Sequence, residues 1–585
     1  MGHTFEIKDE FYLDGEKMKV ISGGMHYFRV LPEYWRDRLE KLKALGCNTV
    51  ETYIPWNFHE PKKGNFRFDG MHDVAHFIEL AEKLGLYVII RPSPYICSEW
   101  EFGGLPAWLL KDRNMRLRCS YEPYLNAVKE YYNVLIPKLV PHQYDRVEHG
   151  GIILMQLENE YGYYGNDTAY LEFLRDTLRE LGITVPFVTS DGPWSEAVFK
   201  SGMVEGALPT GNFGSAAEWQ FGEMRKFIGE NKPLMCMEFW NGWFDAWGEE
   251  HHTTAPEKAA AELDEILKRG SVNFYMFEGG TNFGFMSGRN CGNKTADVTS
   301  YDYDAPLNEA GEITPKYELF RQTISKYAEV RKIPLTTGIK RREYGEVKCT
   351  GKADLFSVLP EISAPVKSAY PLTMEDIGQN YGYILYRTKI CGGETVREIR
   401  LEDANDRVQC YLNKKFICTA FAENISEKSE VSCAESGGTL DLLCENIGRE
   451  NFGTGLENQR KGIYGGVKVN DHRQFGFEIF PLPLDEKQIS AIDFSRGHSG
   501  NSPAFYRFTL NVDEPCDTFL DTEGFGKGCA FVNGFNLGRF WEIGPQRRLY
   551  IPAPLLKIGE NTIIIFETEG KSADSIFLAG SHRLY

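Results

Sequence analysis

The 585-residue sequence lacks long hydrophobic runs. No stretch approaches the about 18 consecutive apolar residues that are needed for a membrane-spanning helix. The start of the chain also lacks a basic segment followed by an apolar one, which is the pattern of a signal peptide. We therefore expect neither a membrane span nor a secretory leader.

An excess of positive charge is also lacking. Lys and Arg total 65 and Asp and Glu total 83, which leaves a formal net charge of −18 at pH 7. Such a chain repels nucleic acid and anionic membranes. We expect neither as a partner, and a neutral substrate fits the charge best.

Patterns typical of disulfide frameworks and metal sites are absent too. The 13 cysteines are odd in number and scattered, and Cys236, Cys410 and Cys529 lie inside apolar runs where a reduced thiol packs as a small hydrophobe. This favours a reducing, cytoplasmic location. The pair His251 and His252 lacks ligand spacing, and no His-Glu-x-x-His occurs, so no metal and no organic cofactor are expected.

Short β-rich runs alternate with longer segments of helical period over the first part of the chain, which is typical of βα units. The expected strands are residues 20–26, 48–54, 87–92, 151–159, 186–190, 207–212, 233–239 and 271–278. The expected helices include residues 32–45, 72–84, 122–139, 169–181 and 256–268. Eight such units predict a (β/α)8 TIM barrel over residues 1–335, with its site at the C-terminal ends of the strands.

The helical period disappears from about residue 335, and short alternating runs separated by Gly, Asn and Asp follow. Residues 408–415 and 529–534 each predict a strand that runs into an Asn-containing hairpin turn. We therefore predict two β-sandwich, jelly-roll-like domains, at residues 336–480 and 481–585. Their residues leave open whether they bind sugar or only pack against the barrel.

Two carboxylates stand out at the ends of apolar runs: Glu160 in QLENEYG and Glu238 in MCMEFWNG. Burying a carboxylate costs free energy unless it is paired or used, so both indicate a built site. The strand count puts them at the ends of strands four and seven, on the catalytic rim of the barrel. Two carboxylates are the working groups of glycoside hydrolysis. Alternation leaves Glu158 and Glu160 open, because both would point to the same side of a strand.

Specific motifs occur along nearly the whole chain. They are SGGMHY at residues 22–27, ETYIPWN at 51–57, RPSPYICSEWEFGGLP at 91–106, GGTNF at 279–283, and GKG, VNG and LGR at 526–528, 532–534 and 537–539. With them the chain resembles the β-galactosidases of glycoside hydrolase family 35, and is most similar to bacterial intracellular enzymes that prefer β-1,3-linked galactose. The resemblance implies a retaining exo-enzyme that hydrolyses terminal non-reducing β-D-galactose, with a galactose-binding-like C-terminal domain.

The resemblance assigns roles to the two carboxylates. The Asn-Glu pair that closes strand four in such barrels selects Glu160 over Glu158 as the acid/base, and Glu238 is the nucleophile. Glu160 must hold a proton to assist the leaving oxygen, whereas Glu238 must be ionised to attack the anomeric carbon and form a covalent galactosyl-enzyme. Retention predicts carboxyl groups roughly 5–5.5 Å apart.

The resemblance also implies a set of sugar-binding residues. They are Tyr53, Ile96, Cys97, Ser98, Glu99, Asn159 and Tyr303. Asn159 is expected to bond the 2-hydroxyl, and Glu99 to make charge-assisted bonds that favour galactose over glucose. Trp240 and Trp243 would either stack on the sugar beyond the cleaved bond or pack in the core, and the sequence leaves both interpretations open.

Two alternatives accompany this prediction. An exo-β-glucosaminidase would keep the fold and mechanism but change the sugar, and a sugar-binding protein would carry an inactive barrel. The presence of Glu160, Glu238 and Asn159 argues against the second. The expected partner is a galactose-terminated oligosaccharide, and the resemblance is compatible with a homodimer.

Overall fold

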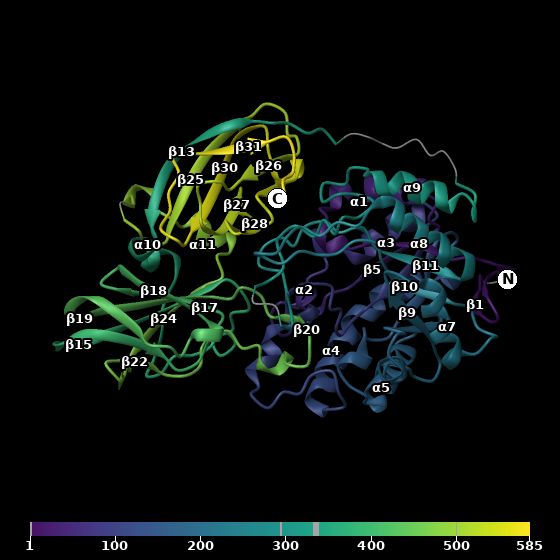
Figure 1. Ribbon diagram of the computed structural model, residues 1–585, viewed down its shortest axis with the longest axis horizontal. Coiled ribbons are helices and arrows are strands. Elements are labelled where there is room, and N and C mark those ends of the chain that lie inside the picture. The colour runs from purple at the N-terminus through teal and green to yellow at the C-terminus, as the bar shows by residue number, and fades with distance from the viewer. Residues whose placement is uncertain (1–2, 293–294, 331–338, 499, 585) are drawn as a thin grey trace.

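The computed structural model describes residues 3–292, 295–330, 339–498 and 500–584, with the backbone alone at 391–394 and 432–436. A closed eight-stranded barrel comes first in the chain, and two all-β domains follow it. Both lie to one side of the barrel in Figure 1, the middle domain in green and the C-terminal domain in yellow. The predicted fold class, a barrel followed by all-β domains, is confirmed.

Parallel pairing closes the barrel, with strands in chain order and β11 returning to β4. The strands are β4 (Ile21–Met25), β5 (Thr49–Tyr53), β6 (Tyr87–Arg91), β7 (Gly151–Gln156), β8 (Phe187–Asp191), β9 (Ala207–Phe213), β10 (Met235–Trp240) and β11 (Ser271–Glu278). Each corresponds to a predicted strand. They read as nearly continuous apolar runs because both faces of a parallel sheet are buried.

Helices cover the outside of the barrel. They are α1 (Pro32–Leu45), α3 (Val74–Lys83), α4 (Glu122–Leu139), α5 (Thr168–Glu180), α6 (Glu196–Ser201), α7 (Ala217–Ile228), α8 (Pro256–Arg269) and α9 (Pro315–Ile324). Local signals fix their ends. Helix α1 begins with Pro32 at its first position, and Gly46, whose φ of 111° suits glycine, follows its last residue. The Asp167 side chain caps α5 by accepting from the Tyr170 amide.

A small sheet at the N-terminus closes the bottom of the barrel. It consists of β1 (Phe5–Ile7), β2 (Phe11–Leu13) and β3 (Glu16–Lys17). Phe5 and Phe11 share a buried cluster with Ile153 and Met235, near the start of two barrel strands. This sheet includes the hairpin whose turn is Asp14-Gly15, with φ values of 50° and 85°. The bottom is thus sealed, and the opposite end is left for a site.

The middle domain is built on a sheet with the order β14-β24-β15-β19-β17-β18. The strands are β14 (Val366–Ser368), β24 (Phe477–Leu482), β15 (Tyr383–Leu401), β19 (Ser429–Glu445), β17 (Arg407–Leu412) and β18 (Lys415–Phe421). Along β15, Ile384 and Tyr386 face the core of this domain, whereas Tyr383 and Leu385 pack in a second cluster with Phe505 of the C-terminal domain. Because successive side chains of a strand point to opposite faces, β15 contributes side chains to the core of the middle domain and to the cluster shared with the C-terminal domain.

The C-terminal domain has the order β28-β27-β30-β25-β13-β31-β26-β29. The strands are β13 (Gly345–Asp354), β25 (Ala504–Val512), β26 (Thr518–Asp521), β27 (Lys527–Val532), β28 (Phe535–Trp541), β29 (Arg548–Ile551), β30 (Gly559–Glu567) and β31 (Ser575–Ala579). The hairpins expected at residues 408–415 and 529–534 are present as β17–β18 and β27–β28.

The pairing of β13 corrects the predicted domain ranges. We assigned this segment to the domain at residues 336–480, but β13 pairs with β25 and β31, in the middle of the C-terminal sheet. The ranges 336–480 and 481–585 therefore divide a single sheet. Sequence order misleads here because hydrogen bonding along an antiparallel sheet ignores distance along the chain. The boundary predicted at 335/336 lies outside the described residues.

One short strand of the middle domain reaches the barrel. It is β20 (Glu450–Phe452), which pairs in parallel with β12 (Arg289–Asn290) from the loop after β11. Figure 1 shows β20 away from the other strands of its domain, beside the barrel. The middle domain thus touches the end of the barrel where the strands finish. Within the described residues, no helix combines the length and apolarity needed to cross a membrane.

Candidate active site

A cavity of about 360 Å³ opens at the C-terminal ends of the barrel strands. It is lined by Tyr53, Cys97, Ser98, Glu99, Asn159, Glu160, Tyr163, Trp194, Glu238, Trp240, Trp243, Phe244, Tyr275, Asn290, Tyr303 and Phe452. Every predicted site residue except Ile96 is among them. Ile96 is fully buried, and its carbonyl oxygen accepts a 3.4 Å hydrogen bond from the Asn159 amide. Its expected contact with a sugar stays a prediction.

Glu238, near the end of β10, is surrounded by hydrogen-bond donors. Its Oε1 accepts from the Tyr53 hydroxyl at 2.9 Å and from Nη2 of Arg91 at 2.6 Å. Its Oε2 accepts from Nε1 of Trp240 at 3.0 Å. Three donors, one of them cationic, fix the positions of both carboxyl oxygens. The side chain is therefore held in one orientation in the cavity.

Glu160 has a different environment. Its Oε1 accepts a single side-chain bond, from the Asn212 amide of β9 at 3.1 Å. Burial, followed by the negative charge of Glu238, raises the pKa of Glu160 to about 8, and the Asn212 bond and the Arg91 charge oppose that rise. Glu160 therefore keeps its proton at neutral pH. The raised pKa makes Glu160 the candidate for the general acid of the pair.

Period-two alternation does not apply to Glu158 and Glu160, because β7 ends at Gln156. Both residues have left-handed backbone conformations, with φ of 57° and 47°. Glu158 turns to Arg118, which donates to its two oxygens at 2.9 and 2.7 Å behind the cavity wall. Our expectation that both would point to the same side was wrong. A residue that leaves the extended conformation no longer follows the pleat.

The loop after β6 supplies three of the lining residues. Cys97, Ser98 and Glu99 are consecutive and have φ of 57°, 57° and 48°. The Tyr301 hydroxyl donates to Oε2 of Glu99, and Nη1 of Arg29 donates to the Ser98 hydroxyl at 2.8 Å. Burial raises the pKa of Glu99 to about 7, against the Tyr301 bond and the Arg29 charge. Burial and nearby carboxylates hold the pKa of the Cys97 thiol well above its usual value, so Cys97 is a wall residue.

Asn159 connects the residues that bond Glu238 with the loop after β6. Its Oδ1 accepts from Arg91 at 2.6 Å, from the Tyr53 hydroxyl at 2.9 Å and from Gln156 at 3.1 Å. Among the residues that the structure describes, the side-chain Nδ2 of Asn159 has only the long bond to the carbonyl oxygen of Ile96. The NH2 group is thus the part of Asn159 that is available to a ligand hydroxyl.

Aromatic rings form the outer rim of the cavity. Trp240 meets Trp194 and Trp243 at centroid distances of 5.7 and 5.5 Å, at steep angles of 60° and 82°. Trp194 is 40% exposed and Trp243 is 37% exposed. Exposed ring faces beside a polar cavity suit stacking on a sugar. Of the two interpretations left open by the sequence, core packing does not fit Trp243, and Trp240 serves as a donor to Glu238.

Several residues of the site were missed. Tyr163, Trp194, Phe244, Tyr275, Asn290 and Phe452 line the cavity, and Arg91 and Asn212 bond the two carboxyl groups. Arg91 carried a usable signal, since it is a charge at the end of an apolar strand, like Glu238. Phe452 carried none, because only the β20–β12 pairing brings it to the barrel. No cluster of three or more potential metal ligands occurs among the residues the structure describes.

Three family descriptions match successive parts of the chain. "Glycosyl hydrolases family 35" matches residues 10–327. "Beta-galactosidase, first all-beta domain" matches residues 371–483, and "Beta-galactosidase, galactose-binding domain" matches residues 503–561.

Curated relatives match along nearly the whole chain. Beta-galactosidase-1-like protein 2 of Homo sapiens is 40% identical, over 95% of this chain and 88% of the relative. Beta-galactosidase of Bos taurus is 40% identical, over 97% of this chain and 91% of the relative. Beta-galactosidase 17 of Arabidopsis thaliana is 37% identical, over 100% of this chain and 90% of the relative. These are animal and plant proteins, so the predicted likeness to bacterial enzymes stays a prediction.

Proposed function

The chain belongs to glycosyl hydrolase family 35, and from that membership we propose that it is a retaining exo-β-galactosidase acting on terminal non-reducing β-D-galactose. It is a glycoside hydrolase, and the sugar and the course of the reaction are what we propose. The observation that carries the proposal is the pair of carboxyl groups in one cavity, Glu238 with three donors and Glu160 with a raised pKa.

In the first step, an ionised Oε atom of Glu238 attacks the anomeric carbon while Glu160 gives its proton to the departing glycosidic oxygen. The bond to the aglycone breaks, and a covalent galactosyl-enzyme forms. The attack consumes the negative charge on Glu238. Because that charge is one cause of the raised pKa of Glu160, the pKa of Glu160 falls in the intermediate.

In the second step, Glu160 acts as a base. It takes a proton from a water molecule, whose oxygen attacks the anomeric carbon from the side the aglycone left. The bond to Glu238 breaks, the carboxylate is restored, and galactose leaves with its β configuration. Two inversions at one carbon give net retention.

The sugar assignment rests on the residues around the carboxyl pair. Glu99 offers a carboxylate, Asn159 offers an amide NH2 and Tyr303 lines the same cavity. Polar groups placed for one arrangement of hydroxyls reject an epimer, because the epimer leaves them unpaired. Two of the relatives, those of Bos taurus and Arabidopsis thaliana, are named beta-galactosidases, which supports galactose. A panel of nitrophenyl β-glycosides tests this: we expect the galactoside to be cleaved, and cleavage of the glucosaminide alone would show an exo-β-glucosaminidase instead.

A preference for β-1,3 linkages is the finer part of the proposal. The rim of Trp194, Trp240 and Trp243 lies where an aglycone sugar would leave the cavity, and ring faces at fixed angles favour some orientations of that sugar over others. Rates on β-1,3-, β-1,4- and β-1,6-linked galactosyl disaccharides decide it. Equal kcat/KM values would remove the preference.

Location and assembly are proposed as well. Eleven of the 13 cysteines are described with free thiols, which supports a reducing, cytoplasmic location, to be checked by cell fractionation. A homodimer is proposed from the family resemblance alone, and light scattering on the purified protein will decide it.

A further inference from the structure

The loop that carries Glu99 is held in an unfavourable backbone conformation. Besides Cys97, Ser98 and Glu99, Phe102 is also left-handed, with φ of 58°. A left-handed backbone is unfavourable for a non-glycine residue, because its Cβ then lies too close to the following carbonyl oxygen. A conformation of this kind persists only where surrounding contacts determine it. The contacts that hold this loop are therefore part of what shapes the sugar-binding side of the cavity.

Many of these contacts come from the middle domain, far along the chain. Nη1 of Arg449 donates to Oε1 of Glu101, two residues after Glu99. The Tyr95 hydroxyl, at the start of the loop, donates to the carbonyl oxygen of Asn451. The Asn451 side chain donates to the Cys97 sulfur at 3.5 Å. The segment from Arg449 to Phe452 thus forms hydrogen bonds with the loop before and after Glu99. Phe452 itself lines the cavity.

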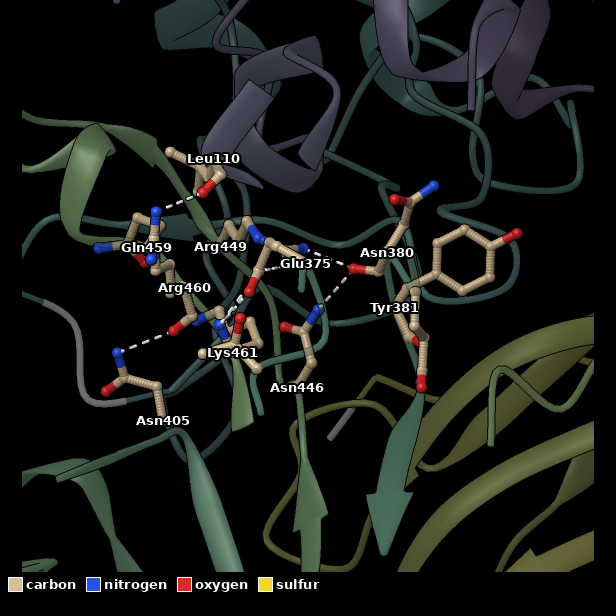
Figure 2. A network of polar contacts seen from close by, with 12 residues as sticks. Leu110, Glu375, Asn380, Tyr381, Asn405, Asn446, Arg449, Gln459, Arg460 and Lys461 are labelled. Carbon is tan, nitrogen blue, oxygen red and sulfur yellow. Dashed lines mark hydrogen bonds and ion pairs between the residues drawn. The ribbon is translucent and has the colours of Figure 1, made fainter. Parts of the chain in front are cut away.

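Arg449 is itself fixed within its own domain. Figure 2 shows it among polar side chains of the middle domain, where its other Nη atom meets Glu375. Its Nη1 also donates to the carbonyl oxygen of Asn380 at 2.6 Å. The guanidinium is fully buried and lies between two buried carboxylates, Glu101 and Glu375. The planar guanidinium can bond both carboxylates at once, so it fixes the barrel loop at Glu101 relative to the middle domain at Glu375.

We propose that Arg449 is a positioning residue of the active site: its ion pair with Glu101 holds the Cys97–Ser98–Glu99 stretch in the conformation that binds the sugar. The middle domain is then a working part of the site. This inference rests on the proposed function, because galactoside hydrolysis is the activity through which it is measured.

Two variants test the role, and the second of them removes every charge of this ion-pair network. Arg449→Lys keeps the charge but cannot reach Glu101, Glu375 and Asn380 together. A triple variant, Arg449→Met with Glu101→Gln and Glu375→Gln, removes all three charges. We expect kcat/KM on a nitrophenyl β-galactoside to fall roughly 10- to 100-fold in each, as for a displaced binding group. If Arg449→Lys fails to fold, the triple variant still gives the answer.

Arg460 provides the matched control. In the same network of Figure 2, it crosses to the barrel and donates to the carbonyl oxygen of Leu110, which lies further along the chain after β6, in the short helix Ala107–Lys111. Arg460→Met removes a contact between the domains of similar kind, and we expect kcat/KM to stay within about 2-fold of the wild type. A loss equal to that of Arg449→Lys would mean that general domain docking is responsible.

A double-mutant cycle separates positioning from stability. If Arg449 acts through Glu99, adding Arg449→Lys to Glu99→Gln will reduce kcat/KM much less than it does in the wild type, whereas Arg460→Met will add independently. Full additivity of Arg449→Lys with Glu99→Gln, or wild-type kcat/KM in folded variants, overturns the proposal. If the wild type cleaves another glycoside and no galactoside, the proposed function fails, and the same ratios on that glycoside still test Arg449.

Discussion

The Nη2 atom of Arg91 lies 2.6 Å from Oε1 of Glu238 and also 2.6 Å from Oδ1 of Asn159. One guanidinium at the end of β6 therefore holds two residues from β10 and the loop after β7. All three residues are at least 95% buried, so these charge-assisted bonds are barely screened by water. Arg91 sets both the orientation of the carboxylate and its position relative to the amide that faces the substrate.

Replacing Arg91 is expected to damage catalysis severely. Arg91→Lys keeps a charge but loses the planar guanidinium that bonds Glu238 and Asn159 together. We expect kcat/KM to fall roughly 100- to 1,000-fold, as when a donor is removed from a preorganised site. Tyr53→Phe, which removes a neutral donor to the same oxygen, is expected to cost less. Steady-state kinetics with circular dichroism as a folding control measure both. Equal losses would argue against a special role of the planar guanidinium.

Glu238→Gln removes the attacking oxygen with almost no change in shape. We expect kcat to fall about 10⁴-fold or more, because an amide cannot form the covalent intermediate, while galactose still binds. Turnover measured by nitrophenol release and binding measured by calorimetry check the two parts. Substantial residual turnover would reassign the nucleophile.

Glu160→Gln removes the proton donor. The loss of kcat/KM, which reports the first step, is expected to be large for substrates with a poor leaving group, such as disaccharides, and small for dinitrophenyl galactosides, whose leaving group departs without a proton. Azide should restore part of the turnover, since it needs no general base. The ratio of rates on the two substrate types is the measurement, and an equal loss on both would count against the acid role.

The pH profile reports the protonation of Glu160. Because its pKa is raised to about 8, the acid form is lost as pH rises through that value, and kcat/KM on a disaccharide should fall there. Asn212 donates to Glu160 and opposes the rise of its pKa, so Asn212→Ala is expected to move the basic limb to higher pH. A limb that moves to lower pH, or does not move, would contradict this assignment.

The exposed tryptophans at the rim predict a variant whose KM for disaccharides is raised. Trp243→Ala should raise KM for disaccharides roughly 3- to 10-fold, as expected for the loss of one ring contact, and should reduce any difference among linkages. Trp219, 49% exposed and not among the residues that line the cavity, provides the control, and Trp219→Ala should behave as the wild type. If Trp243→Ala leaves every disaccharide unchanged, stacking at this rim is excluded.

Much of the barrel could be predicted from the sequence because its signals are local. Apolar runs of strand length mark β4 to β11, and the first helix begins and ends at Pro32 and Gly46. The resemblance then pointed to Glu160 and Glu238, and the structure places both in one cavity. Where the chain leaves regular structure, period-two reasoning failed, as at Glu158. Strand β13 was placed in the wrong domain because its partners lie at least 150 residues away along the chain.

The sequence by itself determined the order of the elements, the family and the identity of the two carboxyl groups, because these depend on neighbouring residues and on motifs. Only the tertiary structure decided what surrounds those groups. Asn212 of β9 donates to Glu160, which follows β7. Phe452 of β20 lines the cavity, and Arg449, just before β20, donates to Glu101. The protonation of Glu160 follows from burial and from the charge of Glu238. Burial and charge proximity are properties of the folded chain, and no local pattern specifies them.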